Sequence, residues 1–227
     1  MIKIAIDGPS GSGKSTLAKA LSRKLGFVYV DTGALYRTVG LYVTEKGVSY
    51  EDKDGVIACL PEINVDLKYD GNGAQHVWLN GKDVGDRIRT SEIAKAASAV
   101  SAIPEVRAFL LDTQRNMALT NNVIMDGRDI GTVIFPDAQV KIYLVASNLA
   151  RAERRCEELK AKGENKTVEE VLADMEQRDR NDSTRKTAPA VPAVDAVFLD
   201  TSAYQPEETL DAALKIITAK VPSLQVK

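Results

Sequence analysis

The sequence has few cysteines, few aromatic residues and no long apolar stretch. Its two cysteines, Cys59 and Cys156, lie far apart and outside any C-x-x-C pattern, so neither a disulfide framework nor a zinc site is expected. No apolar run approaches the roughly 18 residues that a membrane span requires. The apolar start of the chain is too brief for a signal peptide. These absences predict a cytoplasmic protein without a membrane partner.

An excess of basic charge is also absent. The 227 residues carry 30 Lys and Arg against 32 Asp and Glu, which gives a net charge of −2. Proteins that bind DNA or RNA usually present a basic field, so no nucleic-acid partner is expected. The hydrophobic fraction of 44% is ordinary for a globular chain, and the length suits one domain, residues 1–227, with insertions.

What the chain does have is a glycine-rich loop at residues 8–15, which reads GPSGSGKS and fits the pattern G-x-x-x-x-G-K-[ST]. A short apolar strand precedes the loop, and a helix is expected from Thr16 to Leu25. In this context the backbone N–H groups of the loop point at phosphate oxygens. Lys14 would reach the β- and γ-phosphates, and the Ser15 hydroxyl would bind Mg²⁺. The predicted nucleotide-contacting residues are Gly8, Pro9, Ser10, Gly11, Ser12, Gly13, Lys14, Ser15 and Thr16.

Apolar runs that read as strands alternate with helical patterns along most of the chain. The expected strands cover residues 27–30, 123–125, 140–145 and 197–200. This alternation predicts an α/β fold with a parallel sheet and helices on both of its faces. Residues 62–84 differ, because alternating apolar and polar positions there are separated by tight-turn sequences. We therefore expect a small antiparallel β insertion in that region.

Polar residues follow two of the expected core strands, where open α/β sheets bind their ligands. After the second strand come Asp31, Thr32 and, one helical turn later, Arg37. Asp31 or Thr32 could simply cap the helix, or could cap it and also contact a ligand. After the third strand, residues 126–132 read DGRDIGT. An arginine flanked by carboxylates can clamp a phosphate, although a charged surface turn is the alternative.

Arginines gather in the last third of the chain. Arg151, Arg154 and Arg155 share one face of a predicted helix, and a capping box at residues 167–170 opens the next helix. Such residues are commonly solvated and ion-paired. Beside a phosphate loop they could instead form a flap that closes over a transferring phosphoryl group.

The class of phosphate-loop protein follows from what accompanies the loop. A guanine-nucleotide switch should carry an N-K-x-D motif, and none occurs, because Asn165-Lys166 is followed by Thr167-Val168. A small-molecule kinase needs two anionic pockets and a means of closing. The polar strand ends and the arginine-rich segment could supply both.

Several motifs together resemble the bacterial cytidylate kinases. They are the loop at 8–16, DTGALYR at 31–37, IRT at 88–90 with Ala97-Ser98, DGRDIGT at 126–132, FPDA at 135–138, and the segment from Arg178-Asp179 to Arg185. The resemblance covers essentially the whole chain. It implies transfer of the γ-phosphoryl group of ATP to CMP or dCMP, with Mg²⁺ as cofactor and small-molecule partners only, by a protein that we expect to be a monomer.

The resemblance also implies a role for individual residues. Those implied in catalysis are Lys14, Arg128, Arg151 and Arg155, and residues 149–163 correspond to the lid. Those implied in binding CMP are Asp31, Thr32, Arg37, Ser98, Arg107, Arg128, Asp129, Arg178, Asp182 and Arg185. Two rivals stay open: a kinase of another small acceptor such as UMP, and a non-catalytic ATP-binding regulator.

Overall fold

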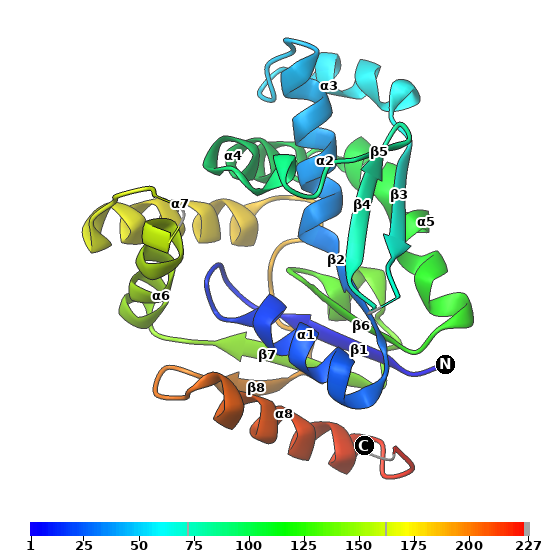
Figure 1. Ribbon diagram of the computed structural model, residues 1–227, viewed down its shortest axis with the longest axis vertical. Helices are drawn as coiled ribbons and strands as arrows, with labels where there is room; N and C mark the ends of the chain where they lie inside the picture. Colours follow the sequence, from blue (N-terminus) through cyan, green and yellow to red (C-terminus); the bar gives the residue numbers. More distant parts are fainter. Residues whose placement is uncertain (72, 162, 225–227) are drawn as a thin grey trace. The chain divides into compact units, whose positions relative to one another are not determined.

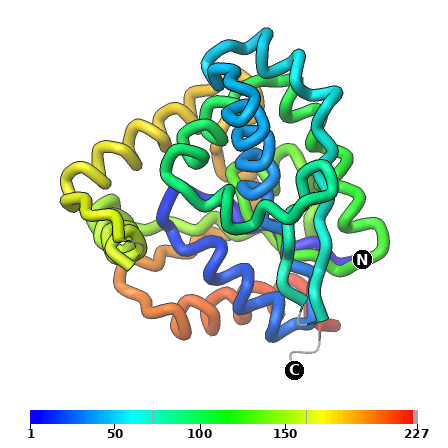
Figure 2. The backbone as a smooth tube through the Cα atoms, turned by 45° about the horizontal axis from the view of Figure 1, so that its top comes forward, coloured from blue at the N-terminus to red at the C-terminus, as the bar shows by residue number. Residues whose placement is uncertain are grey.

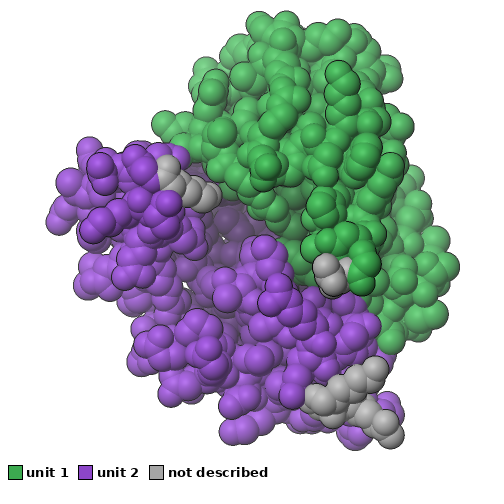
Figure 3. All heavy atoms as spheres, viewed as in Figure 1, with its two compact units in different colours: residues 1, 28–123 green, residues 2–27, 124–227 purple. Residues whose placement is uncertain are grey.

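The computed structural model describes residues 1–71, 73–161 and 163–224 (Figures 1 and 2). These residues form two compact units, which Figure 3 shows in different colours. Unit 1 contains residue 1 and residues 28–123, and unit 2 contains residues 2–27 and 124–227. The single domain expected over residues 1–227 stays a prediction, and its last three residues lie outside the described part.

The strands of unit 2 belong to a mostly parallel sheet and lie in the order β6-β1-β7-β8. Within unit 2, β1 pairs in parallel with β7, which pairs in parallel with β8. Helices α1 and α8 pack against each other and against these strands. The predicted fold class, a parallel sheet with helices and a small antiparallel sheet, is confirmed. The bounds are β1 Lys3–Asp7, α1 Lys14–Leu25, β6 Val123–Gly127, β7 Val140–Val145, β8 Val197–Asp200 and α8 Pro206–Lys220.

Two further helices of unit 2, α6 (Asn148–Ala161) and α7 (Val168–Thr184), pack side by side around their own apolar cluster (Figures 1 and 2). The cluster consists of Ala152, Leu159, Val171 and Met175. The predicted capping box is present, since the Thr167 hydroxyl accepts from Glu170 N–H and the Glu170 carboxylate accepts from Thr167 N–H. The lid expected at 149–163 includes Lys162, which lies outside the described residues.

Unit 1 is built on helix α2, whose residues from Ala34 to Val43 are mostly buried. Gly40 lets α4 approach closely, because a Cβ at this position would lie 3.0 Å from the Ala96 Cβ. The helical and strand bounds are β2 Val28–Asp31, α2 Thr32–Glu45, α3 Lys53–Cys59, η1 Leu60–Glu62, η2 Arg87–Arg89, α4 Ser91–Val100 and α5 Pro104–Thr120.

The predicted antiparallel insertion is also found in unit 1. Strands β3 (Val65–Tyr69), β4 (Gln75–Leu79) and β5 (Lys82–Asp83) form a three-stranded sheet. Its register pairs Val65 with Leu79, so buried residues face each other across the hairpin. Asn72, in the first predicted turn, lies outside the described residues.

Two features of unit 2 differ from the sequence-based expectation. The first helix begins at Lys14, so a start at Thr16 is wrong. Gly13 adopts a left-handed conformation with φ 89° and the helix follows at once, which puts Lys14 and Ser15 in its first turn. The segment after β6 forms one turn of π-helix, η3 (Ile130–Ile134), which no sequence pattern indicated. Among the residues that the structure describes, no helix is long and apolar enough to cross a membrane.

Candidate active site

The glycine-rich loop joins β1 to α1 in unit 2 and is shaped by three glycines with positive φ. Gly8, Gly11 and Gly13 have φ values of 148°, 69° and 89°. A Cβ at Gly8 would lie 2.1 Å from the Leu144 carbonyl oxygen, and a Cβ at Gly11 would lie 2.7 Å from the Met175 Cε. Only glycine fits such backbone geometry without strain. The loop therefore packs against β7 and α7.

Lys14 is buried with its ammonium group held by the loop itself. Its Nζ donates to the Pro9 carbonyl at 2.6 Å and lies 3.4 Å from the Ser12 hydroxyl. Burial lowers the pKa of Lys14 well below its usual value, and the nearby Arg128 guanidinium lowers it further. A buried lysine in this position favours an anionic ligand, because a nearby negative charge would stabilise the protonated ammonium group and raise its pKa again.

Ser15 meets a carboxylate that the sequence analysis did not assign to the metal site. The Ser15 hydroxyl donates to the Asp126 carboxylate at 2.8 Å, and Asp126 is buried near the end of β6. A hydroxyl and a carboxylate are oxygen donors of the kind that Mg²⁺ prefers. The described residues contain no group of three or more acidic, histidine or cysteine side chains that could hold a metal. The donor set therefore fits an ion that completes its shell with water and phosphate oxygens.

Helices α6 and α7 reach the loop at Ser10. The Ser10 N–H donates to Asp179 at 2.9 Å, and the Ser10 carbonyl accepts from Arg151 at 2.7 Å. Arg151 and Asp179 are themselves ion-paired. Both backbone polar groups of one loop residue are thus fixed by a single pair of charges. The sequence contained the Asp179 position within a motif but gave no reason to assign it this contact.

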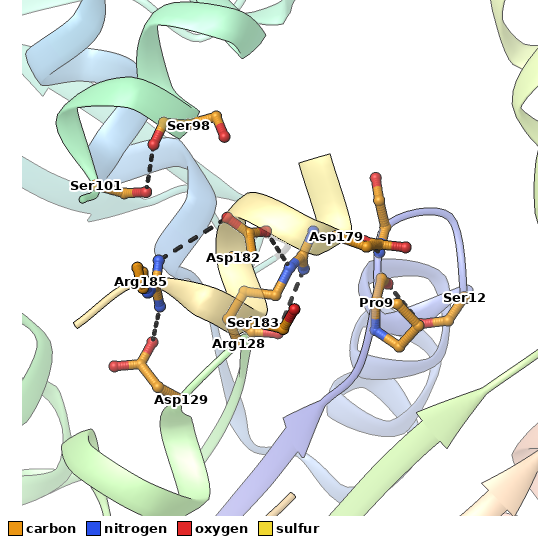
Figure 4. Close-up of polar contacts among 12 residues, drawn as sticks. Pro9, Ser12, Ser98, Ser101, Arg128, Asp129, Asp179, Asp182, Ser183 and Arg185 are labelled. Carbon is orange, nitrogen blue, oxygen red and sulfur yellow. Dashed lines mark hydrogen bonds and ion pairs between the residues drawn. The ribbon is translucent and has the colours of Figure 1, made fainter. Parts of the chain in front are cut away.

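The DGRDIGT segment and the end of α7 form a buried cluster of alternating charges in unit 2 (Figure 4). Arg128 Nε pairs with Asp182 at 2.9 Å. Arg185 lies 3.5 Å from Asp129 and 3.9 Å from Asp182. The alternative of a charged surface turn is wrong for this segment, because the Asp129 and Asp182 side chains are each only 6–7% exposed. Arg178 lies on α7, four residues before Asp182.

The arginines of α6 take separate directions. Arg151 turns to the loop, Arg154 donates to the Thr201 carbonyl, and Arg155 pairs with Glu158 at 2.9 Å. The three side chains are spaced for one helix face but do not form one cluster. Of the predicted loop residues, Ser12 is buried, whereas Ser15 and Thr16 are exposed in the first turn of α1.

In unit 1, Asp31 has two partners at the start of α2. Its carboxylate caps the helix by accepting from Ala34 N–H at 3.0 Å, and it pairs with Arg89 at 3.0 Å. Thr32 is buried as the first residue of α2, and Arg37 donates to the Ile88 carbonyl at 3.1 Å. The cap is therefore confirmed, and whether Asp31 also contacts a ligand stays a prediction.

Ser98 lies in the last turn of α4 and Arg107 in the first turn of α5, on either side of the segment that joins the two helices. Arg107 is buried, donates to the Ser101 carbonyl at 3.2 Å and stacks over the Tyr36 ring at 5.4 Å. The Ser98 carbonyl accepts from the Ser101 hydroxyl at 2.8 Å (Figure 4). Arg107 thus occupies the first turn of α5, as predicted, with its charge turned inward.

Comparison with known proteins identifies the family. The family model described as cytidylate kinase matches residues 4–219. The chain belongs to the cytidylate kinase family. It is 50% identical over 215 residues to the cytidylate kinase of Fervidobacterium nodosum, covering 95% of each chain. The cytidylate kinase of Desulfitobacterium hafniense is 41% identical over 226 residues, covering 100% of this chain and 97% of the relative.

The fold of this cytidylate kinase family member extends to more distant proteins. A gluconokinase from Sinorhizobium meliloti 1021 has a crystal structure with a TM-score of 0.50 to this chain at 15% sequence identity. The match covers 98% of this chain and 95% of the gluconokinase chain. At this identity the likeness concerns the fold alone.

Proposed function

We propose that this chain transfers the γ-phosphoryl group of ATP to CMP or dCMP, giving ADP and CDP or dCDP. One observation carries the proposal: unit 2 combines a complete phosphate loop with a buried arginine–aspartate cluster. Membership of the cytidylate kinase family supports the choice of acceptor. We further propose that the chain acts as a monomer on small molecules, without a nucleic-acid or membrane partner.

The donor side of the reaction follows from the loop. Lys14 would exchange its contact with the Pro9 carbonyl for the β- and γ-phosphates. Ser15 and Asp126 would hold Mg²⁺ together with phosphate oxygens. When bound, the ion neutralises charge on the phosphates. Arg151 and Arg155, from the proposed lid at residues 149–163, would stabilise the charge that develops on the transferring group. Phosphoryl transfer needs positioning and charge neutralisation above all, so no dedicated general base is proposed.

The acceptor side uses arginines for the phosphate and carboxylates for the nucleoside. Arg128 and Arg185, with Thr32 and Arg37, would hold the CMP phosphate, and Arg178 and Asp182 would meet the ribose. The cluster of unit 2 is nearly neutral without substrate, because each of its arginines is paired with an aspartate. Substrate phosphate would therefore replace carboxylates as the partner of these arginines.

The family resemblance assigns the reading of the cytosine ring to Asp129, Ser98 and Arg107. It also gives Asp31 as a residue that binds CMP. Cytosine carries an exocyclic amino donor where uracil carries a carbonyl acceptor. An ionised Asp129 can accept from the amino group and repels the uracil oxygen. A polar group left unpaired in a closed site gives strong discrimination between two such bases.

A panel of acceptors tests the proposal. ADP release would be measured with Mg²⁺-ATP and CMP, dCMP, UMP, AMP or GMP, each supplied alone. Turnover confined to CMP and dCMP is the expected result. Faster turnover with another acceptor would void the base-reading assignment and favour the first rival. ATP binding without turnover on any acceptor would favour a regulator. Light scattering tests the monomer.

A further inference from the structure

Asp7 is a buried carboxylate that the proposed reaction does not use. It ends β1, directly before the loop glycine Gly8, and its side chain is shielded from solvent. Its two oxygens accept from two successive backbone amides, Ile130 N–H at 2.8 Å and Gly131 N–H at 2.7 Å. Both contacts lie within unit 2 and join chain segments that are more than 120 positions apart.

A buried carboxylate costs free energy unless its charge is stabilised by hydrogen bonds or nearby charges. Burial raises the pKa of Asp7 to about 6, and Asp129 nearby adds to the rise, whereas the two amide hydrogen bonds and Lys14 oppose it. The charged form is therefore held mainly by the Ile130 and Gly131 amides. The same two hydrogen bonds fix the backbone of the segment that contains Ile130 and Gly131.

That segment begins with Asp129, the residue proposed to read cytosine. The amides bound by Asp7 follow Asp129 directly in the chain. On the other side of the same peptide unit, the Asp129 carbonyl accepts from Val133 N–H at 2.9 Å and from Ile134 N–H at 3.2 Å, which forms the π-turn η3. Hydrogen bonds thus hold three backbone groups after the Asp129 Cα: the Asp129 carbonyl, the Ile130 N–H and the Gly131 N–H.

The carboxylate of Asp7 also lies close to the glycine at position 131. A Cβ there would lie 3.3 Å from Asp7 Oδ2 and 3.1 Å from the Lys141 Cδ. A side chain at this position would therefore crowd both the Asp7 carboxylate and the Lys141 side chain, which makes Gly131→Ala a second way to disturb the Asp7 contact.

We propose that Asp7 is a positioning residue that sets the direction of the Asp129 carboxylate and so determines the discrimination between CMP and UMP. This inference rests on the proposed function of Asp129. It adds a residue outside the substrate pocket to the determinants of base specificity.

The test is the ratio of kcat/KM for CMP to kcat/KM for UMP in the full-length Asp7→Asn protein. The amide keeps the shape of the side chain but places an N–H₂ group against one backbone N–H. An unmet hydrogen bond of this kind should lower the ratio by roughly tenfold or more. The KM for CMP should rise, while the KM for ATP should stay within about twofold.

Asp200→Asn is the matched control. Asp200 in the same unit also accepts from a backbone amide and a hydroxyl, both of Ser202, but lies outside the proposed site. Its substitution should leave the CMP to UMP ratio unchanged. Gly131→Ala disturbs the same contact from the other side and should lower the ratio as Asp7→Asn does, which keeps the proposal testable if Asp7→Asn fails to fold.

The double variant with Asp129→Asn shows whether Asp7 acts through Asp129. If it does, Asp7→Asn causes no further loss of selectivity in the Asp129→Asn background. A normal ratio in Asp7→Asn beside a lowered ratio in Asp129→Asn would overturn the positioning role alone. An Asp7→Asn protein with a raised KM for ATP and a normal ratio would assign Asp7 to the phosphate loop instead. A normal ratio in Asp129→Asn would overturn both this inference and the proposed role of Asp129.

Discussion

Arg128 shows how a single residue links the folded state to the proposed reaction. Its guanidinium is largely buried and its charge is balanced by Asp182 at 2.9 Å. A phosphate group can replace that partner because guanidinium groups bind carboxylates and phosphates in the same bidentate geometry. The charge of Arg128 is therefore balanced without substrate, and in the proposed reaction the substrate phosphate takes the place of Asp182.

We expect Arg128→Ala to lower kcat/KM for CMP by roughly a hundredfold or more, because the substrate phosphate loses a charged donor in a buried site. The KM for ATP should change little. Steady-state kinetics with each substrate varied in turn provides the measurement. Arg128→Lys is the control, because it keeps the positive charge but loses the forked geometry of the guanidinium group. Its kcat/KM for CMP should lie between the values of the wild type and of Arg128→Ala. Wild-type kinetics in Arg128→Ala would remove the residue from the acceptor site.

Ser15 gives a second prediction at this scale. Ser15→Ala removes the hydroxyl that donates to Asp126 and that would bind the ion. We expect a higher Mg²⁺ concentration for half-maximal activity and a kcat reduced roughly tenfold or more. Ser15→Thr keeps the hydroxyl and should stay near the wild type. A Mg²⁺ titration at fixed ATP distinguishes them, and superimposable curves for all three proteins would exclude Ser15 as a ligand.

At the scale of helices and strands, the capping box at the start of α7 is expected to stabilise this helix. The helix brings Asp179 to the loop and Asp182 to the arginine cluster, and it starts at the capping box of Thr167 and Glu170. Substitution of an N-cap residue by alanine costs about 1 kcal/mol of helix stability. A change at residue 167 should therefore loosen the first turn of α7 before it affects the rest of the molecule.

Thr167→Ala should reduce amide protection in the first turn of α7 by roughly fivefold, the equivalent of about 1 kcal/mol. Hydrogen exchange read by mass spectrometry would report this at peptide level. Thr167→Ser retains the hydroxyl acceptor and serves as the control. Equal exchange in Thr167→Ala and the wild type would show that the cap contributes nothing to the helix.

At the level of elements, much of the fold was predictable. The loop motif, the strand–helix alternation, the alternating pattern of the insertion and the capping box are local signals. The structure confirms the loop, the mostly parallel sheet with helices, the antiparallel sheet of the insertion and the capping box. No local pattern predicted the π-turn η3, and two amides of its first residues are bound by Asp7, more than 120 positions away in the chain. The directions of Arg151 and Arg154 were not predictable either, because their partners Ser10 and Thr201 lie far away in the chain. Arg155 differs, since it pairs with Glu158 on the same helix.

The sequence predicted which residues belong to the candidate site, but not which residues they contact. The sequence placed Lys14 and Ser15 in the loop, and the family resemblance indicated Arg128, Asp129 and Arg185. Neither the Ser15–Asp126 hydrogen bond nor the Ser10–Asp179 contact follows from a motif, because each depends on how β6 or α7 packs in unit 2.

At the scale of the whole molecule, the raised pKa of Asp7 should make the free energy of unfolding depend on pH. The folded pKa of about 6 lies above the ordinary value of 3.8, so the folded protein binds a proton here more tightly than the unfolded chain. The stabilisation from protonation is fully present below pH 3.8 and is lost as the pH rises through about 6. The shift corresponds to about 3 kcal/mol at most.

We therefore expect the free energy of unfolding of the wild type, relative to Asp7→Asn, to rise as the pH falls from 7.5 to about 4.5. Denaturant unfolding of both proteins at several pH values measures the difference, and groups common to both cancel. A difference that stays constant across this range would show that Asp7 titrates near its ordinary pKa. Discrimination between CMP and UMP should weaken over the same interval, since protonated Asp7 loses acceptor capacity.

The placement of β1 has a consequence for the chain during its synthesis. This strand emerges from the ribosome early, yet in the sheet it lies between β6 and β7, which are made more than a hundred residues later. The loop that follows waits longer still, because Ser10 is held by Asp179, 169 positions downstream. A nascent chain that stops before α7 carries the complete phosphate-loop motif without its contacts to Asp179 and Met175. We therefore expect nucleotide to stabilise mainly chains in which α7 has already been made.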